Sequence, residues 1–468
     1  MNSYLAVSVS PHTFTWLYLL AAVFFILALK ALSSPKQARY GMWIGIVGMV
    51  IAAAITWVAQ KASHDWVIAV AFVAGAVVAV PAARFIQMTA IPQMVAIFNG
   101  VGGGAAATVT TVEFLHDGAS GIGPSHAVEV IFGVAIGCIS FSGSMLAFAK
   151  LQGIMTGTPI TYRGQQFANG IVLVVVVGAS VATVADPRDI WLLITALAAL
   201  AVGVGIVLPI GGADTPVLIS LLNAFTGLAV AADGFALDNL VLIVAGTLVG
   251  ASGSLLTKLM SDAMGRSLPN ILFAAVGSTV TAGAGPGAGG ERSYRSGDPT
   301  DVATLLAYSH RVMMVPGYGL AVAQAQQTIV ELAKALEARG VRVTYGIHPV
   351  AGRMPGHMNV LLAEANVPYE ELEEMEQANG ELPTTDVALV VGANDVVNPA
   401  ARDAPSSPIY GMPILNVDQA EHVVFLKRSM RPGFSGVEND LFYDPKTVML
   451  FGDAKDSLAK LVSAVKAA

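Results

Sequence analysis

Long apolar runs, separated by short polar breaks, fill residues 12–260. A run of about 20 residues, as a helix rising about 1.5 Å per residue, is long enough to cross a hydrocarbon core about 30 Å thick. The pattern predicts nine membrane-spanning helices, at about 12–32, 40–60, 65–83, 86–114, 127–149, 167–184, 189–209, 215–233 and 238–260.

The fourth run is the least regular. Pro92 interrupts it near its start, and glycines at 100 and 102–104 occupy its centre. Proline removes a helical hydrogen bond and glycine lowers helix propensity. Two shorter segments therefore remain an alternative to one span, and they would change the number of crossings.

The pattern changes after a stretch at 283–300 that is rich in glycine and turn residues. Strand-like and helix-like segments then alternate, which predicts an α/β Rossmann-like domain with a doubly wound parallel sheet. We expect a polytopic α-helical membrane bundle at 1–265, a linker at 266–300 and the α/β domain at 301–468. The expected strands are 311–316, 342–347, 386–391, 414–416, 423–427 and 448–451, and the expected helices are 320–339, 369–379 and 454–466.

Composition supports this division of the chain. The sequence is 54% hydrophobic and 12% charged, with a mean hydropathy of +0.66, which is too apolar for an ordinary soluble protein. Residues 1–290 carry ten basic and ten acidic side chains, so the net charge of −7 belongs to the C-terminal part. An acidic domain disfavours nonspecific nucleic-acid binding. A single cysteine, Cys138, excludes an internal disulfide and a thiolate metal cluster, and we expect no metal site.

The basic residues of the apolar part predict its orientation. In a nine-span topology only Lys61 and Arg188 fall on one side of the membrane. Basic residues gather on the cytoplasmic side, so we expect the C-terminal domain in the cytoplasm. The residues on that side are Lys30, Lys36, Arg39, Arg84, Lys150, Arg163, Lys258 and Arg266.

A glycine-rich turn at 317–322 lies between an expected strand and an expected helix. In dinucleotide-binding turns the first glycine permits the tight turn and the second lets the backbone approach a pyrophosphate, roles that fit Gly317 and Gly319. Val322 replaces the third glycine of the fingerprint. A turn with no ligand is the alternative.

The end of the second expected strand lacks the carboxylate that NAD-binding domains use for the ribose 2′-hydroxyl. His348 and Pro349 follow the strand, Arg353 lies just beyond, and no carboxylate occurs before Glu364. This disfavours NAD and permits a 2′-phosphate. After another expected strand, Lys427-Arg428-Ser429 offers two cations and a hydroxyl suited to a phosphate dianion, or merely a solvated strand end.

Four segments of the C-terminal part closely resemble the beta subunit of proton-translocating nicotinamide nucleotide transhydrogenase. The resemblance continues through 210–216 and 222–227, and so covers essentially the whole chain. The four segments are 317–322, 348–365, 392–399 and 427–437.

The resemblance implies NADP(H) bound in a reversed orientation. It places 317–322 near the pyrophosphate, 427–429 at the 2′-phosphate, 433–437 in a lid, and Asp395 near the nicotinamide as the candidate catalytic residue. Phe434, where the family often has Tyr, lacks a hydroxyl for the cofactor. The implied cofactor-binding residues are Gly317, Tyr318, Gly319, Leu320, Ala321, Val322, Arg353, Pro355, Gly356, Asn359, Gly392, Ala393, Asn394, Asp395, Lys427, Arg428, Ser429, Gly433, Phe434, Ser435 and Gly436.

Hydride transfer between nicotinamides needs no acid or base from the protein, so the absence of a catalytic triad is expected. Residues 301–468 have room for one dinucleotide domain, so NAD(H) must come on a partner, an alpha subunit with further membrane helices. The resemblance also implies a dimer of alpha-beta units in the bacterial inner membrane, in which hydride passes from NADH to NADP⁺ as protons enter the cytoplasm.

Polar residues within the spans are the candidates for a proton path, because such residues usually face a bundle interior or water. We expect Asn99, Ser142, Ser144 and Asn223 on this path; interhelical hydrogen bonding is the alternative. Some family members carry His where Asn99 stands, and an amide does not titrate. Either the partner supplies the proton carrier, or Asn99 and Asn223 hold water.

Two charged residues near the span ends are candidates for coupling the domains. Asp214 lies in a short turn and Arg266 leads into the linker, although surface solvation explains both equally well. Two other functions remain open for the whole chain. One is a nucleotide-gated transporter or channel with a cytoplasmic Rossmann sensor, and the other is a membrane scaffold that has no affinity for NADP⁺.

Overall fold

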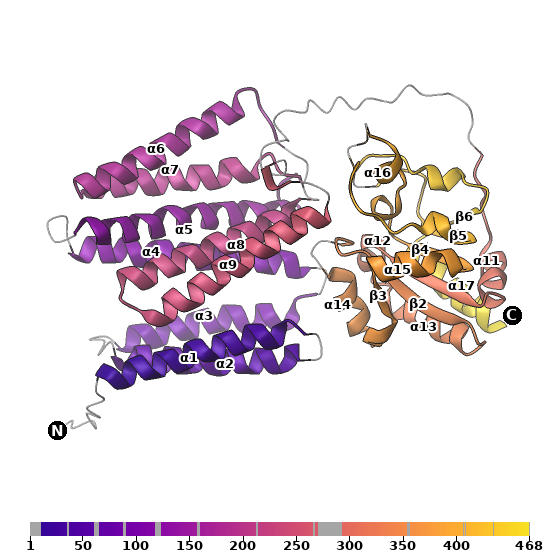
Figure 1. Cartoon of the computed structure of the whole chain (residues 1–468), viewed down its shortest axis with the longest axis horizontal. Coiled ribbons are helices and arrows are strands. Elements are labelled where there is room, and N and C mark those ends of the chain that lie inside the picture. The colour runs from indigo at the N-terminus through magenta and orange to yellow at the C-terminus, as the bar shows by residue number, and fades with distance from the viewer. Residues whose placement is uncertain are drawn as a thin grey trace. The chain divides into compact units, whose positions relative to one another are not determined.

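The chain divides into two compact units, one built from the apolar helices and one around a sheet (Figure 1). The computed structural model describes residues 11–34, 37–59, 65–87, 90–117, 123–156, 160–211, 214–264, 267–269, 293–352, 356–405, 407, 409–433 and 435–467.

Nine helices of the described residues are long and apolar enough to cross a membrane, which confirms the prediction of nine spans. They run in roughly the same direction in the helical unit (Figure 1). Their bounds are α1 Pro11–Leu32, α2 Ala38–Ala59, α3 Asp65–Phe85, α4 Ile91–Asp117, α5 Pro124–Leu151, α6 Gln165–Ala185, α7 Asp189–Val207, α8 Thr215–Ala236 and α9 Leu240–Ala263.

The fourth apolar run forms one continuous helix, α4, so the alternative of two segments is wrong. Pro92 lies in its first turn, where the amide that proline lacks has no helical partner. The glycines serve packing: a Cβ on Gly137 of α5 would lie 2.7 Å from the carbonyl oxygen of Gly103 of α4. Glycine at both positions lets the two helix backbones approach closely.

The second unit contains a six-stranded parallel sheet in the order β3-β2-β1-β4-β5-β6, as expected for a doubly wound domain. One apolar core covers each face of the sheet. Figure 1 shows helices on both sides of it. The strands are β1 Arg311–Pro316, β2 Arg342–Ile347, β3 Leu372–Glu374, β4 Val387–Val391, β5 His422–Lys427 and β6 Thr447–Phe451, and the α-helices are α11 Pro299–Ala307, α12 Tyr318–Val322, α13 Gln326–Glu337, α14 His357–Glu364, α15 Met375–Glu381, α16 Ala400–Asp403 and α17 Ala454–Ala467.

The single helix expected at 320–339 is wrong, because α12 ends at Val322 and α13 begins at Gln326. Gln324 adopts a left-handed conformation with φ of 50°. The Ala325 amide then donates to the carbonyl of Leu320 at 3.1 Å, which closes the short helix and turns the chain. A left-handed residue at a helix end is common, although glycine usually occupies it.

Two other expectations at the sheet edge and in the loops are wrong. The helix expected at 369–379 contains the edge strand β3, which pairs with β2, before α15 begins. The strand expected at 414–416 is a loop, because its backbone groups form hydrogen bonds with the side chain of Asn379 and not with a neighbouring strand. That amide donates to the Ile414 carbonyl at 2.9 Å and accepts from the Asn416 amide at 2.8 Å.

The linker expected at 266–300 lies for the most part outside the described residues. Its last residues belong to the sheet unit, since the Gly297 amide donates to the Met449 carbonyl of β6 at 3.0 Å. Tyr294 also packs edge-on against Phe451, with ring centroids 5.7 Å apart. Asp298 then caps α11, accepting from the Thr300 amide.

Candidate functional site

The carboxyl ends of β1 and β4 form the switch point of the sheet, where strand order reverses and where doubly wound domains bind ligands. The turns that follow these two strands are joined backbone to backbone. The Gly317 amide donates to the Val391 carbonyl at 2.9 Å, and the Gly319 amide donates to the Gly392 carbonyl at 2.9 Å. The predicted nucleotide turn is therefore built together with the loop after β4.

Each of the three glycines at this junction is required by the other loop. A Cβ on Gly317 would overlap the Cα of Ala393, and one on Gly319 would lie 2.6 Å from the Cα of Gly392. Gly392 itself has a φ of 70°, a conformation that glycine adopts at little cost. Glycine at positions 317 and 319 thus allows the turn after β1 to contact the turn after β4.

The loops after β4 and β5 bring Lys427, Asn394 and Asp395 together. The Lys427 ammonium donates to Asn394 Oδ1 at 3.4 Å and to the Arg431 carbonyl at 2.7 Å, and it lies 4.2 Å from the centroid of the Phe442 ring. Burial lowers the pKa of Lys427 to about 8, although the charge of Asp395 acts in the opposite direction. Because burial outweighs the attraction of Asp395, this half-buried ammonium is suited to receive a further anion.

The segment expected to be a lid packs directly on the loop after β4. The Ser435 amide donates to Asp395 Oδ2 at 2.8 Å, and Asn394 Nδ2 donates to Asp395 Oδ1 at 3.0 Å. A Cβ on Gly433 would overlap Asn394 Nδ2 and Asp395 Oδ1, so a larger residue there would displace these two side chains. Gly436 turns the chain with a φ of 74°. Asp395 is thus the anchor of this segment.

The remaining expected cofactor residues have varied surroundings. Leu320 and Ala321 are buried in the core, whereas Val322, Arg428 and Ser429 are exposed. Arg353, Pro355 and Phe434 lie outside the described residues. Gly356 is the left-handed N-cap of α14, on which Asn359 is half-buried, and the Tyr318 ring lies 6.5 Å from that of His357.

The residue after β2, where NAD-binding domains have a carboxylate, is a buried histidine. His348 Nε2 lies 2.8 Å from the Pro413 carbonyl, and Nδ1 accepts from the Val350 amide at 3.2 Å. The second bond requires an unprotonated Nδ1, so the first is donated by Nε2–H. Burial lowers the pKa of His348 to about 4. This side chain holds the loop in place as a neutral imidazole.

In the helical unit, Asn99 belongs to a hydrogen-bonded group that we call the Asn99 layer: Asn99, Ser140, Ser144 and Thr226. Asn99 Nδ2 donates to Ser144 Oγ at 2.9 Å and to Ser140 Oγ at 3.3 Å. Ser140 Oγ lies 2.6 Å from Thr226 Oγ1 and 2.8 Å from the Leu222 carbonyl. The layer therefore joins α4, α5 and α8.

The other expected proton-path residues lie apart from this layer. Ser142 faces α7, where it donates to the Leu200 carbonyl at 2.8 Å, and Asn223 is exposed on α8. Asp214 precedes α8 at its N-cap position, and Arg266 lies outside the described residues. Sequence reasoning missed Ser140 and Thr226. Ser140 is four residues before Ser144 and so shares its helix face, which was the available signal.

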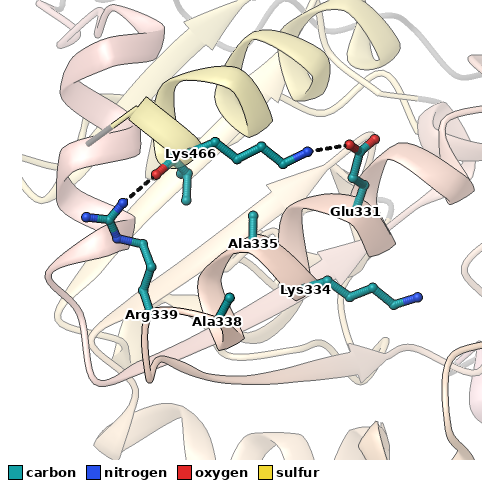
Figure 2. Close-up of a pocket in the computed structure, with 7 residues that line it drawn as sticks. Glu331, Lys334, Ala335, Ala338, Arg339 and Lys466 are labelled. Carbon is teal, nitrogen blue, oxygen red and sulfur yellow. Dashed lines mark hydrogen bonds and ion pairs between the residues drawn. The ribbon is translucent and has the colours of Figure 1, made fainter.

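A shallow groove of about 390 Å³ lies between α13 and α17. Lys466 pairs with Glu331 at 2.7 Å, and Arg339 donates to the Val465 carbonyl at 2.6 Å (Figure 2). Glu331 lies near the middle of α13, and Arg339 follows this helix shortly before β2 begins. The groove is therefore on the opposite side of the sheet from the carboxyl ends and contributes nothing to the site at the switch point.

Comparison with known proteins places the sequence in one family. A family model described as NAD(P) transhydrogenase beta subunit matches residues 14–464. Two relatives, both NAD(P) transhydrogenase subunit beta from Rhodospirillum rubrum and one of them from a specified strain, are 48% identical over 455 residues. The match covers 96% of this chain and 98% of each relative.

Proposed function

Because the chain belongs to the family of NAD(P) transhydrogenase beta subunits, we propose that it binds NADP(H) at the carboxyl ends of β1, β4 and β5. In this proposal it exchanges hydride with NAD(H) held by an alpha subunit, in the direction from NADH to NADP⁺ as protons enter the cytoplasm. The observation that carries it is the half-buried Lys427 ammonium beside Asn394 at the switch point.

The residues present fit an NADP-type cofactor better than NAD. Neutral, buried His348 stands where a carboxylate would bind a ribose 2′-hydroxyl, so that contact is lost. Lys427, Arg428 and Ser429 would instead hold the 2′-phosphate, since two cations and a hydroxyl match a dianion. The bound nicotinamide supplies the hydride chemistry.

The chain's own part in the reaction is to bind, orient and exclude water. The joined turns at Gly317 and Gly392 fix the floor of the site. The segment from Gly433 to Gly436 is anchored on Asp395 and would cover the nucleotide, with Asp395 on the nicotinamide side. A covered, dry site favours direct transfer between two nicotinamides, which requires no proton donor from the protein.

Proton coupling belongs to the helical unit in this proposal. The Asn99 layer joins three helices, and Asp214 at the start of α8 and Arg266 beyond α9 are the candidates for coupling to nucleotide binding. Purified alpha-beta complex in vesicles should reduce NADP⁺ with NADH faster under an imposed proton gradient. A rate indifferent to the gradient would refute the coupling.

The nucleotide site is tested by the double variant Lys427→Ala, Arg428→Ala. Loss of two charge-assisted contacts should weaken NADP⁺ binding to the complex by about 100-fold or more, with far less effect on NAD⁺. Lys334→Ala, Lys460→Ala removes the same charge from exposed positions of α13 and α17 and should leave both affinities unchanged. Equal losses for the two nucleotides in the first variant would contradict the assignment. Isothermal titration measures all four affinities.

The pH dependence of the same affinity tests Lys427 alone. A bound phosphate favours the ammonium, so NADP⁺ binding should weaken above the free pKa of about 8, by up to about tenfold per pH unit. In Lys427→Arg the cation persists to much higher pH, and the affinity should stay flat in this range. If the NADP⁺ affinity of the wild-type protein does not change above pH 8, Lys427 does not bind the phosphate.

A further inference from the structure

Asp233 of α8 is the only buried carboxyl group among the described residues of the helical unit. Its side chain is 4% exposed, and its Oδ1 atom has no hydrogen-bond partner in the described structure. The buried ammonium of Lys150 gives the contrast, because it donates to the carbonyls of Val207, Leu208 and Ile210. A buried carboxylate without such partners is costly inside a membrane and marks a functional position.

The space beside Asp233 exists because residue 133 of α5 is glycine. A Cβ on Gly133 would lie 3.0 Å from Asp233 Oδ1 and 3.1 Å from Thr110 Oγ1 of α4. Thr110 already donates to the Ala106 carbonyl of its own helix at 3.0 Å, so its hydroxyl hydrogen is engaged. We call Thr110, Gly133 and Asp233 the Asp233 layer; it joins the same three helices as the Asn99 layer.

The two layers lie on the same helix faces. Asp233 is seven residues beyond Thr226 on α8, and Gly133 is seven residues before Ser140 on the antiparallel α5. Seven residues are about two helical turns, or about 10 Å, so each pair shares one face. Thr110, about three turns beyond Asn99 on α4, follows the same direction. Between the layers these faces carry small buried residues, among them Ala106, Gly137 and Ala229.

We propose that Asp233 is the proton-binding group that this chain itself supplies to the translocation path, an inference that rests on the proposed proton coupling. A proton from water at the end of the bundle where α8 ends converts the carboxylate into a neutral carboxyl group. The same proton then leaves towards the Asn99 layer and the carboxylate re-forms, so one proton passes per cycle and no other bond changes. The Asn99 layer provides hydrogen-bonding groups along the route, but none of its side chains is titratable.

The other titratable groups towards this end belong to the helices around Asp233. They are Glu113 and His116 on α4, His126 and Glu129 on α5, and Asp238 after α8. His126 Nδ1 lies 3.5 Å from Glu129 Oε2. Asp233 forms no ion pair within the described residues. Its protonation state is therefore set by its buried environment and by the access of water from that end of the bundle.

The test uses the complete alpha-beta complex in sealed vesicles and the variant Asp233→Asn. The neutral amide has nearly the same shape, so assembly and NADP⁺ affinity should be retained while proton movement driven by nucleotide exchange falls at least about tenfold. Infrared spectra should lose one carbonyl band of a protonated carboxyl group. Asp233→Glu keeps the titratable group and should restore part of the flux with a shifted band, and it also decides the matter if the Asn variant does not assemble.

Asp238→Asn is the matched control, since Asp238 is exposed just beyond the same helix. Its left-handed φ of 48° is one that asparagine adopts readily. This variant should keep both flux and band. Full proton movement in Asp233→Asn, or an unchanged carboxyl band, would overturn the inference while the proposed function stands. An unaltered complex that moves no protons would overturn both.

Discussion

The two units of this chain both contain strongly apolar segments, but one unit leaves such segments exposed on its surface and the other buries them. The α3 helix buries no side chain of its most apolar window, whereas every residue of β4 is buried. A helix satisfies its own backbone, so lipid can cover its apolar side chains. A strand depends on its neighbours for hydrogen bonds, and β4 obtains them from β1 and β5. The solvent each unit meets therefore decides where its apolar residues lie.

The units also use close backbone contacts differently. In the sheet unit they are concentrated at one place, where Gly317 and Gly319 meet Gly392. In the helical unit they recur along the seams between helices, as at Gly103 and Gly137 and again between Gly227 and Gly246. Lipid provides no hydrophobic force between helices, so small residues and polar contacts must hold them together. The elements of the sheet unit are held together by two large apolar cores, one on each face of the sheet.

The largest expected effect is that of Gly317→Ala in the sheet unit. The added methyl group would overlap the backbone of Ala393, which two joined loops hold in place, so the unit should lose about 3 kcal/mol and most of its NADP⁺ affinity. Calorimetry of the complex in detergent measures the first and nucleotide titration the second. Gly380→Ala, in α15 with open space around it, is the control and should be neutral or slightly stabilising. Equal thermal unfolding midpoints for the two variants would contradict the claim that the two joined loops form a rigid junction.

Gly137→Ala should have an intermediate effect in the helical unit. The methyl group would lie 2.7 Å from the Gly103 carbonyl oxygen, but two helices can separate slightly, so we expect a loss of about 1–2 kcal/mol. Gly170→Ala on α6 meets no atom within 4 Å and serves as the control. Thermal midpoints of the complex in detergent compare the two variants. A Gly137 effect larger than that of Gly317 would reverse the comparison between the units.

The most gradual expected effect is the pH dependence that His348 gives to the sheet unit, because it is spread over the pH range between the folded and unfolded pKa values. Its folded pKa of about 4 lies below the unfolded value of about 6.5, so its contribution is complete above about pH 6.5 and is lost as the pH falls towards 4. The slope is at most about 1.4 kcal/mol per pH unit. His348→Gln should remove this component, whereas exposed His310→Gln should not. Calorimetry across this range would contradict the assignment if both variants kept the wild-type slope.

Much of the fold could be predicted because the relevant signals are local. Nine apolar runs gave nine helices, and β1, β2 and β4–β6 follow runs of apolar residues that suit a buried strand. The errors arose where distant groups intervened. The edge strand β3 is too short and acidic to show an apolar pattern, and the loop at 414–416 takes its hydrogen bonds from the side chain of Asn379.

The candidate sites show the same limit. Gly317 and Lys427 were indicated by their positions beside expected strands, and Asn394 by the family resemblance. Their common location depends on the neighbouring order of β1, β4 and β5. In the helices, the sequence marked Asn99, Ser142 and Ser144 as polar without showing which of them meet. Asp233 had no motif to mark it.

The sequence by itself determined which segments cross the membrane, which form the sheet, and the family to which the chain belongs. These follow from the period of apolar residues and from motifs within short segments. Only the tertiary structure decided that Ser144 contacts Asn99 while Ser142 faces α7, and that Asp233 is buried beside Gly133. The physical reason is that helix rotation, set by glycine contacts between helices distant in sequence, selects which polar side chains share the interior.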